Sequence, residues 1–460
     1  MNFDALLLSR VQFAFVVVFH FLLPAFTVGL ASYIAVLEGM HLATGRAAYL
    51  RLSNFWIRIF AVSFGMGVVS GIVMPFQFGT NWSRYADLVG DVVAPLMGYE
   101  GLTAFFLEAG FLGVLLFGRA LVPRWAHFAA AVMVAIGTLF STFWILVVNS
   151  WMHTPAGYSI VAGRFFPLDW LAVIWNPSFP FRFMHTLAAV YLTTAFAVIG
   201  VAGYFLRRRR FEEESRLMLK MGLGLAAVLV PLQALLGDAH GLNTLHHQPA
   251  KLAAIEGIWD TGPRQPAVLF AIPDELAQKN RAAIEIPGLA SLYLTHSWDG
   301  VVTGLRDVPP ADRPAVVPVF FAFRLMIGMW ALMLALTLCG GWLAFHGRLW
   351  TARRYQQACT GSIPVGFIAV TAGWVTTEAG RQPWVVYGLV RTADAVTPGL
   401  TAAQVLLSLV LYVVVYAAVF GAGGYFLVKM VRAGPTAAAS PPMPAAEKRP
   451  ARPLSAADAG

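Results

Sequence analysis

A few side chains that can bind iron or carry protons lie inside otherwise apolar segments of the sequence. They are His20, His185, Met326, Glu100, Glu108 and Glu378. Ionisable residues are costly inside a membrane and are functional candidates by default. Histidine and methionine together hold haem iron in electron-transfer haems, whereas an iron with a single protein ligand keeps one face open for a gas. The set therefore points to haem binding, to proton transfer, or to both.

Each of these residues also has an ordinary explanation. A lone histidine in a membrane helix often serves only as a hydrogen-bond donor to another helix. A methionine is usually packing material, and a buried glutamate can be protonated and hydrogen-bonded. Depth favours function, because His20 lies roughly 13 Å from the outer end of its segment at 1.5 Å per residue. The other residues fall at the same outer half, so two histidines, a methionine and an acid share one level.

Glu100 and Glu108 are eight residues apart in one apolar segment. In a regular helix this spacing is about 12 Å along the axis and within a quarter turn around it. Acids placed along one helix suit a proton relay. The polar residues Ser141, Thr142 and Asn149 of the next segment could extend such a path, although small polar residues also serve packing.

Two further stretches combine charges with helix-breaking residues. "GWVTTEAGRQPW" (373–384) places Glu378 and Arg381 three residues apart, with Pro383 behind them. "HHQPAKLAAIEGIW" (246–259) places Lys251 and Glu256 five apart on an expected short helix. From the residues alone, a solvated amphipathic turn is the simpler interpretation of the second stretch.

The elements that must position these residues are membrane helices. The chain has 460 residues, of which 58% are hydrophobic and 12% charged, and a soluble domain carries about twice that charged fraction. About 20 apolar residues cross a bilayer, which predicts an all-α integral membrane protein with about nine transmembrane helices. The expected spans are 11–37, 54–75, 94–118, 126–150, 184–206, 218–237, 317–343, 362–378 and 400–428.

Basic residues in the short loops set the expected orientation. The net charge of +9 is no sign of nucleic-acid binding, because alternate loops collect most of the Lys and Arg residues. Cytoplasmic loops carry this excess, so we expect the N-terminus outside and the C-terminus in the cytoplasm. The expected organisation is transmembrane helices 1–6 within 1–237, an outer loop at 238–316, helices 7–9 within 317–433, and a disordered cytoplasmic tail at 434–460.

Six stretches together resemble subunit I of the cytochrome bd-type quinol oxidases. They are "FHFLLPAFTVGL" (19–30), "EGLTAFFLEAGFLG" (100–113), "RFMHTL" (182–187), "QPAKLAAIEG" (248–257), "FRLMIG" (323–328) and "GWVTTEAGRQPW" (373–384). They run in the order of that family and extend over nearly the whole chain apart from the tail. The outer loop is short, as in the branch that includes cyanide-insensitive oxidases.

The resemblance implies roles for individual residues. His185 and Met326 match the axial pair of a low-spin haem b, with Arg324 beside it. His20 and Glu378 match ligands of the two high-spin haems, in an order that the sequence does not decide. Glu100 and Glu108 match acids with a proton or ligand role near those haems. Lys251 and Glu256 match quinol-loop residues, and Trp374 and Arg381 match electron-path and propionate partners.

The resemblance further implies a catalytic subunit of a terminal oxidase in the bacterial cytoplasmic (inner) membrane. It would oxidise ubiquinol at the periplasmic loop 238–316 and reduce O2 to water, which builds a proton gradient without pumping. The implied cofactors are two haems b, one low-spin and one high-spin, with haem d or a third haem b. The implied partners are a second membrane subunit and a small single-helix subunit. A diheme quinone-reactive cytochrome and a proton-coupled transporter are the alternatives.

Overall fold

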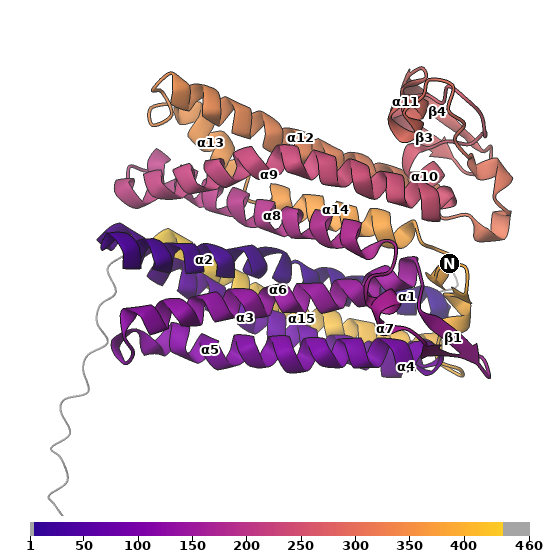
Figure 1. Ribbon diagram of the computed structural model, residues 1–460, viewed down its shortest axis with the longest axis horizontal. Coiled ribbons are helices and arrows are strands. Elements are labelled where there is room, and N and C mark those ends of the chain that lie inside the picture. The colour runs from indigo at the N-terminus through magenta and orange to yellow at the C-terminus, as the bar shows by residue number, and fades with distance from the viewer. Residues whose placement is uncertain (1–3, 436–460) are drawn as a thin grey trace, which may run out of the picture.

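The computed structural model describes residues 4–435, except the side chains of 103–105, as a bundle of roughly parallel helices (Figure 1). Within these residues nine helical segments are long and apolar enough to cross a membrane. The segments are Ala5–Thr44, Ala47–Thr80, Ser83–Ala120, Arg124–His153, Phe179–Arg207, Glu212–His247, Val316–Phe345, Arg353–Ala379 and Ala402–Ala433. The predicted all-α multi-pass membrane fold is confirmed.

These segments are built from long helices, and short elements connect them. The helices of the spans are α1 (Ala5–Phe21), α2 (Pro24–Thr44), α3 (Ala47–Thr80), α4 (Ser83–Tyr99), α5 (Phe105–Phe117), α6 (Arg124–His153), α8 (Phe179–Arg207), α9 (Glu212–His247), α12 (Val316–Phe345), α13 (Arg353–Gly361), α14 (Val365–Ala379) and α15 (Ala402–Ala433). The connecting helices are α7 (Trp170–Ile174), α10 (Pro249–Glu256) and α11 (Leu289–Thr295). Three antiparallel pairs join β1 (Tyr158–Val161) to β2 (Arg164–Pro167), β3 (Ala267–Asp274) to β4 (Lys279–Ile286), and β5 (Trp384–Val386) to β6 (Val390–Arg391).

The first and third spans are interrupted. α1 ends at Phe21 and α2 begins at Pro24. Proline has no backbone N–H to pair, so it is well suited to the first position of a helix. In the third span a π-helical turn, Glu100–Ala104, separates α4 from α5. The expected span 94–118 therefore lies within one membrane-crossing segment that is not a regular α-helix throughout. The wider turn also changes the angle between Glu100 and Glu108 from the one that a regular helix would give.

The sixth span is longer than expected. α9 continues to His247 instead of ending at 237, so the loop between α9 and α12 begins at Gln248. Its 36 residues correspond to about 54 Å of helix at 1.5 Å per residue, well beyond the roughly 30 Å hydrocarbon layer. Only a one-residue break separates this helix from α10, which it therefore positions directly.

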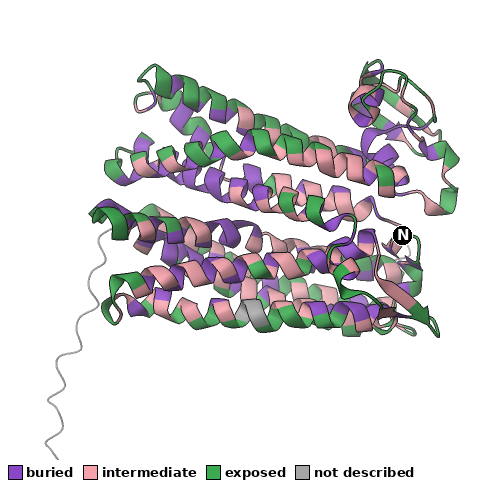
Figure 2. Ribbon diagram, in the orientation of Figure 1, coloured by how far each residue is buried: buried purple, intermediate pink, exposed green. Residues whose placement is uncertain are grey.

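α8 is the centre of the bundle (Figure 2). In its most apolar window 83% of the residues are buried, compared with 11% for α15. A Cβ on Gly203 would lie 2.7 Å from the Gln356 carbonyl oxygen, and one on Gly200 would lie 3.1 Å from that of Cys359. These glycines let α13 approach the backbone of α8, and α2, α9 and α14 also pack on this helix.

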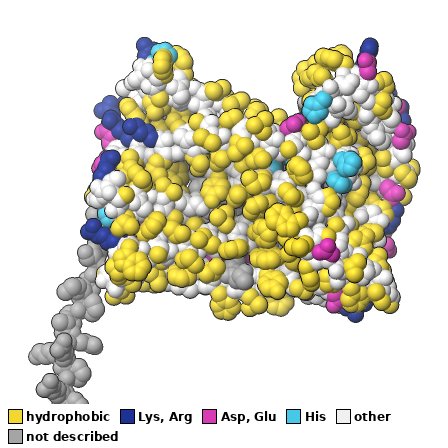
Figure 3. Space-filling model, viewed as in Figure 1, with side chains coloured by type: hydrophobic (Ala, Val, Ile, Leu, Met, Phe, Trp, Pro, Cys, Tyr) yellow, Lys and Arg dark blue, Asp and Glu magenta, His cyan; other side chains and the backbone are white. Residues whose placement is uncertain are grey.

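Charge is distributed unevenly between the two ends of the bundle. On the face in Figure 3, apolar side chains cover the middle, and many Lys and Arg side chains gather at the end opposite β3 and β4. The end that holds β3 and β4 also holds α10 and α11 (Figure 1). Most of the predicted tail, residues 436–460, lies outside the described residues.

Candidate functional site

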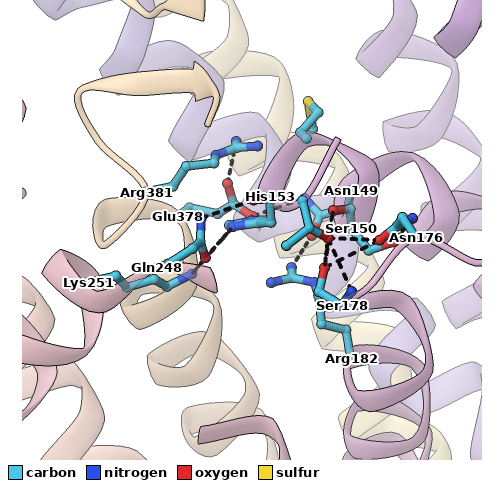
Figure 4. Close-up of polar contacts among 12 residues, drawn as sticks. Asn149, Ser150, His153, Asn176, Ser178, Arg182, Gln248, Lys251, Glu378 and Arg381 are labelled. Carbon is cyan, nitrogen blue, oxygen red and sulfur yellow. Dashed lines mark hydrogen bonds and ion pairs between the residues drawn. The ribbon is translucent and has the colours of Figure 1, made fainter. Parts of the chain in front are cut away.

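Glu378, the acid near the end of α14, is the centre of a polar network (Figure 4). One carboxylate oxygen, Oε2, accepts a hydrogen bond of 2.6 Å from Arg381 Nη2. The other, Oε1, accepts one of 2.9 Å from Asn149 Nδ2 on α6. His153 at the end of α6 places its Nε2 3.4 Å from the same oxygen. Glu378 is therefore held by two cationic or potentially cationic groups and an amide.

His153 connects this network to α10. The ring is fully buried within the bundle, and its Nδ1 lies 3.4 Å from Lys251 Nζ. Lys251 also donates to Gln248 Oε1 at 3.2 Å, and Gln248 Oε1 lies 3.3 Å from the same His153 nitrogen. The structure thus joins two sequence-predicted residues, Lys251 and Glu378, through one imidazole.

Positive charge exceeds negative charge in this network. Arg182 of α8 donates to Asn149 Oδ1, so the guanidinium groups of both Arg182 and Arg381 act on the carboxylate of Glu378. Among the described residues, Arg182 Nε and Arg381 Nε and Nη1 are buried without a hydrogen-bond partner. Burial, followed by the charge of Arg182, holds the pKa of Lys251 well below its usual range.

Sequence reasoning missed His153 and Arg182 as members of this site. His153 ends an apolar segment, where a histidine is expected at the membrane surface rather than in a buried contact. Arg182 lies outside the expected span 184–206, yet α8 begins at Phe179 and carries it into the bundle. The spacing of Arg182 and His185 on one helix face was the available signal.

His185 and Met326 lie on different helices, each beside a glycine. His185 is on α8, where a Cβ on Gly237 of α9 would be 3.4 Å from His185 Cε1. Gln233 Nε2 is 3.3 Å from His185 Nε2. Met326 is on α12, and a Cβ on Gly373 would be 3.0 Å from its Sδ. Both predicted ligands therefore have neighbours of minimal size.

His20, Glu100 and Glu108 are spread over the first and third spans. His20 Nδ1 is 3.1 Å from Ser70 Oγ, and a Cβ on Gly71 would lie 3.0 Å from its ring. Ser141, one of the residues that could extend the acid path, donates to Glu100 Oε1 at 2.9 Å. Glu108 is 8% exposed. The ring of Trp374 lies 5.7 Å from that of Phe21, next to His20.

Glu256, which is buried, and Arg324, which is half-buried, form a second group at the loop between α9 and α12. α10 is buried, with Lys251 at 3% and Glu256 at 6% exposure, so the simpler interpretation of a solvated turn is wrong. Arg324 Nη1 donates 2.7 Å to the Ile255 carbonyl, and its Nη2 donates 2.5 Å to that of Val268. The guanidinium thus fastens α10 and β3 to α12.

Comparison with known proteins shows which family has this architecture. A family model described as cytochrome bd terminal oxidase subunit I matches residues 8–435. Cytochrome bd ubiquinol oxidase subunit 1 of Bacillus subtilis (strain 168) is 33% identical over 425 residues, which cover 89% of this chain and 90% of that protein. Cytochrome bd-II ubiquinol oxidase subunit 1 of Escherichia coli (strain K12) is 31% identical, with 94% and 98% covered.

A solved structure agrees with these matches. The bd oxidase from Geobacillus thermodenitrificans aligns with a TM-score of 0.87 at 30% identity, over 94% of this chain and 100% of that chain. The fold and the matches define a multi-pass membrane subunit of a terminal oxidase. The chain belongs to the cytochrome bd terminal oxidase subunit I family.

Proposed function

We propose that this chain is the haem-bearing catalytic subunit of a quinol oxidase in the bacterial inner membrane. It oxidises ubiquinol at the outer loop and reduces O2 to water, together with a second membrane subunit and a small single-helix subunit. The observation that carries the proposal is the buried network from Lys251 to Glu378. It links the helix proposed to bind quinol to an acid proposed to hold iron.

The unpaired guanidinium atoms fit a haem. The two positive charges of Arg182 and Arg381 outnumber the single negative charge of Glu378. Three nitrogens of these arginines are buried without partners among the described residues. A buried cation needs an anionic partner, and arginine matches the planar carboxylate of a haem propionate. These two side chains would therefore orient propionates, while Trp374 would lie along the electron path.

The ligand residues also fit the group. His185 and Met326 would hold a low-spin haem b, and His20 and Glu378 would each hold one high-spin haem, one of type b and the other of type d or b. The glycines Gly71, Gly237 and Gly373 keep side-chain bulk away from three of these ligands. Haem bound there would supply one-electron transfer and oxygen binding.

Lys251 and Glu256 are proposed to bind quinol. Burial raises the pKa of Glu256 and lowers that of Lys251, so both groups are shifted toward their uncharged forms. A carboxyl with a raised pKa exchanges protons closer to neutral pH. Glu256 would accept a proton from quinol, and the Lys251 amine would hydrogen-bond a quinol oxygen.

The proposed proton movements give a gradient without a pump. Protons from quinol would leave at the α10 end, while protons for oxygen reduction would come from the cytoplasm by way of Glu108 and Glu100. The Ser141 contact with Glu100 supports this path. The proposed orientation, with the N-terminus outside and the C-terminus in the cytoplasm, is supported by the Lys and Arg side chains at the end opposite β3 and β4 (Figure 3).

A reduced-minus-oxidised absorption spectrum of the purified complex, with haem extraction, tests the proposal. We expect three haems, one low-spin and two high-spin, a carbon monoxide response and quinol-driven oxygen consumption. Met326→Leu should convert the low-spin haem to high-spin or remove it. A colourless complex would contradict every haem assignment, and haem without a carbon monoxide response would favour a diheme electron carrier instead.

A further inference from the structure

Glu256 has one neighbouring side chain that the proposed function leaves without a role. The phenol of Tyr293, on α11, lies close enough to the Glu256 carboxyl to act on its pKa. The Tyr293 ring packs with Leu252 and Ile258 in a small apolar cluster, and the side chain is partly exposed. The phenol therefore lies between a buried carboxyl and the outer loop.

We propose that Tyr293 is a positioning residue for quinol oxidation, which orients the Glu256 carboxylate and carries its proton outward. The inference rests on the proposed function, because it takes Glu256 as the group that receives the quinol proton. Nothing in the sequence pattern singles out Tyr293, since α11, which carries it between β4 and α12, has no charged motif around it.

Arg324, the charged neighbour of Glu256, cannot carry the proton of that carboxyl. Arg324 of α12 is the second group that acts on the carboxyl from the described residues packed around α10. Its Nε, Nη1 and Nη2 all donate to backbone carbonyl oxygens, including those of Phe320 and Val268. Arg324 also keeps its proton throughout and so cannot pass one on. A phenol both donates and accepts hydrogen bonds, which leaves Tyr293 as the group able to relay a proton.

Proton balance requires such an exit. Each quinol loses two protons and two electrons, and the electrons leave to the membrane-embedded acceptor of the proposed function. When a quinol O–H bond breaks, the proton passes to a carboxylate oxygen of Glu256. Glu256 must lose that proton before it accepts the second one. The Tyr293 oxygen takes the proton while the phenol's own proton moves to water at the loop surface, which restores both groups.

The test compares Tyr293→Phe with the unaltered complex, because phenylalanine keeps the packed ring and removes only the hydroxyl. We expect kcat for quinol oxidation to fall about tenfold, below the 100-fold or greater effects typical of direct acid–base groups, while KM changes by less than about twofold. The Tyr293 hydroxyl lowers the pKa of Glu256. Its loss should therefore move the acidic limb of the pH profile to higher pH.

Three further variants make the result decisive. Tyr158→Phe, on β1, is the matched control and should leave the kinetics unchanged. Tyr293→His should recover part of kcat, because imidazole also donates and accepts, and its haem spectrum reports whether the complex is assembled. Glu256→Gln should abolish most quinol oxidation with the haem spectrum intact.

The outcomes separate the two claims. An unaltered kcat and pH profile in Tyr293→Phe, with Glu256→Gln impaired, would overturn the role of Tyr293 and leave the quinol site standing. A lower kcat without a shift of the acidic limb would also overturn it. Normal quinol kinetics in Glu256→Gln would instead reject the proposed quinol site itself.

Discussion

Each of the two ring nitrogens of His153 contacts a residue of a different proposed site. Nδ1 lies 3.4 Å from Lys251 Nζ, and Nε2 lies 3.4 Å from Glu378 Oε1. A neutral imidazole donates from one nitrogen and accepts at the other. It can therefore accept from the lysine amine and donate to the carboxylate at the same time, which gives α10 and α14 a common partner.

This arrangement predicts different effects for two substitutions of His153. Glutamine also donates and accepts, so His153→Gln should keep the haem spectrum and most of the quinol-driven oxygen consumption. His153→Leu should leave buried polar partners unsatisfied, at about 1–3 kcal/mol each, and activity should fall tenfold or more. Oxygen consumption at matched haem content measures the difference. Equal activities in the two variants would exclude the bridging role.

Glu378 and Arg381 should respond unequally to substitution. Glu378→Ala removes the proposed iron ligand and leaves Arg381 buried without its anion, and breaking a buried pair costs about 3–5 kcal/mol. We expect loss of a high-spin haem and of oxygen reduction. Arg381→Lys keeps the charge but loses planar two-point contact, so it should be milder. Full haem content and activity in Glu378→Ala would contradict the ligand role of Glu378, and the pair would then be only an ion pair at the end of a helix.

At the scale of elements, Arg324 fastens the loop between α9 and α12 to the bundle. Its guanidinium reaches the carbonyl oxygens of Ile255 on α10 and Val268 on β3 from a position within α12. It also lies 3.3 Å from the ring centre of Phe320. The assignment of Arg324 to a haem environment stays a prediction, whereas its hold on the loop rests on these contacts.

Arg324→Ala should therefore release the loop without unfolding the bundle. We expect trypsin to cleave faster at Lys279 and Arg281 on the exposed β4 strand, while the nine spans remain resistant. Timed digestion of purified complex followed by mass spectrometry measures the rate. Arg313→Ala, which loses contacts confined to the loop's own carbonyls, is the control. Equal cleavage rates in the two variants would contradict the fastening role.

The sequence predicted elements better than it predicted their contacts. Apolar length was enough to find the spans, because crossing a bilayer is a local requirement. The burial of α10 was not readable in this way. Its eight residues, PAKLAAIE, have no polar face that marks them as exposed or buried, and neighbouring elements decide the outcome. His153 and the π-helical turn at Glu100 depend on packing between helices in the same way.

At the scale of the whole molecule, the orientation can be measured directly. With the exposed Cys339 replaced by alanine, Cys359 is buried and should not react. Leu276→Cys, at a fully exposed position of the loop between β3 and β4, should react with a membrane-impermeant maleimide on intact spheroplasts. Arg208→Cys, between α8 and α9, should react only after permeabilisation. The reverse pattern would invert the proposed topology.

The central place of α8 has a consequence for how the protein is made. α13 and α14, which pack on this helix, are synthesised about 150 residues after it. At 5–20 residues per second, the ribosome needs roughly 7–30 s for that stretch. During this interval the glycine face of α8 meets lipid, or an insertion chaperone, instead of its final neighbours. The helix with the most buried apolar window among the described spans is therefore only partly packed until α13 and α14 have been synthesised.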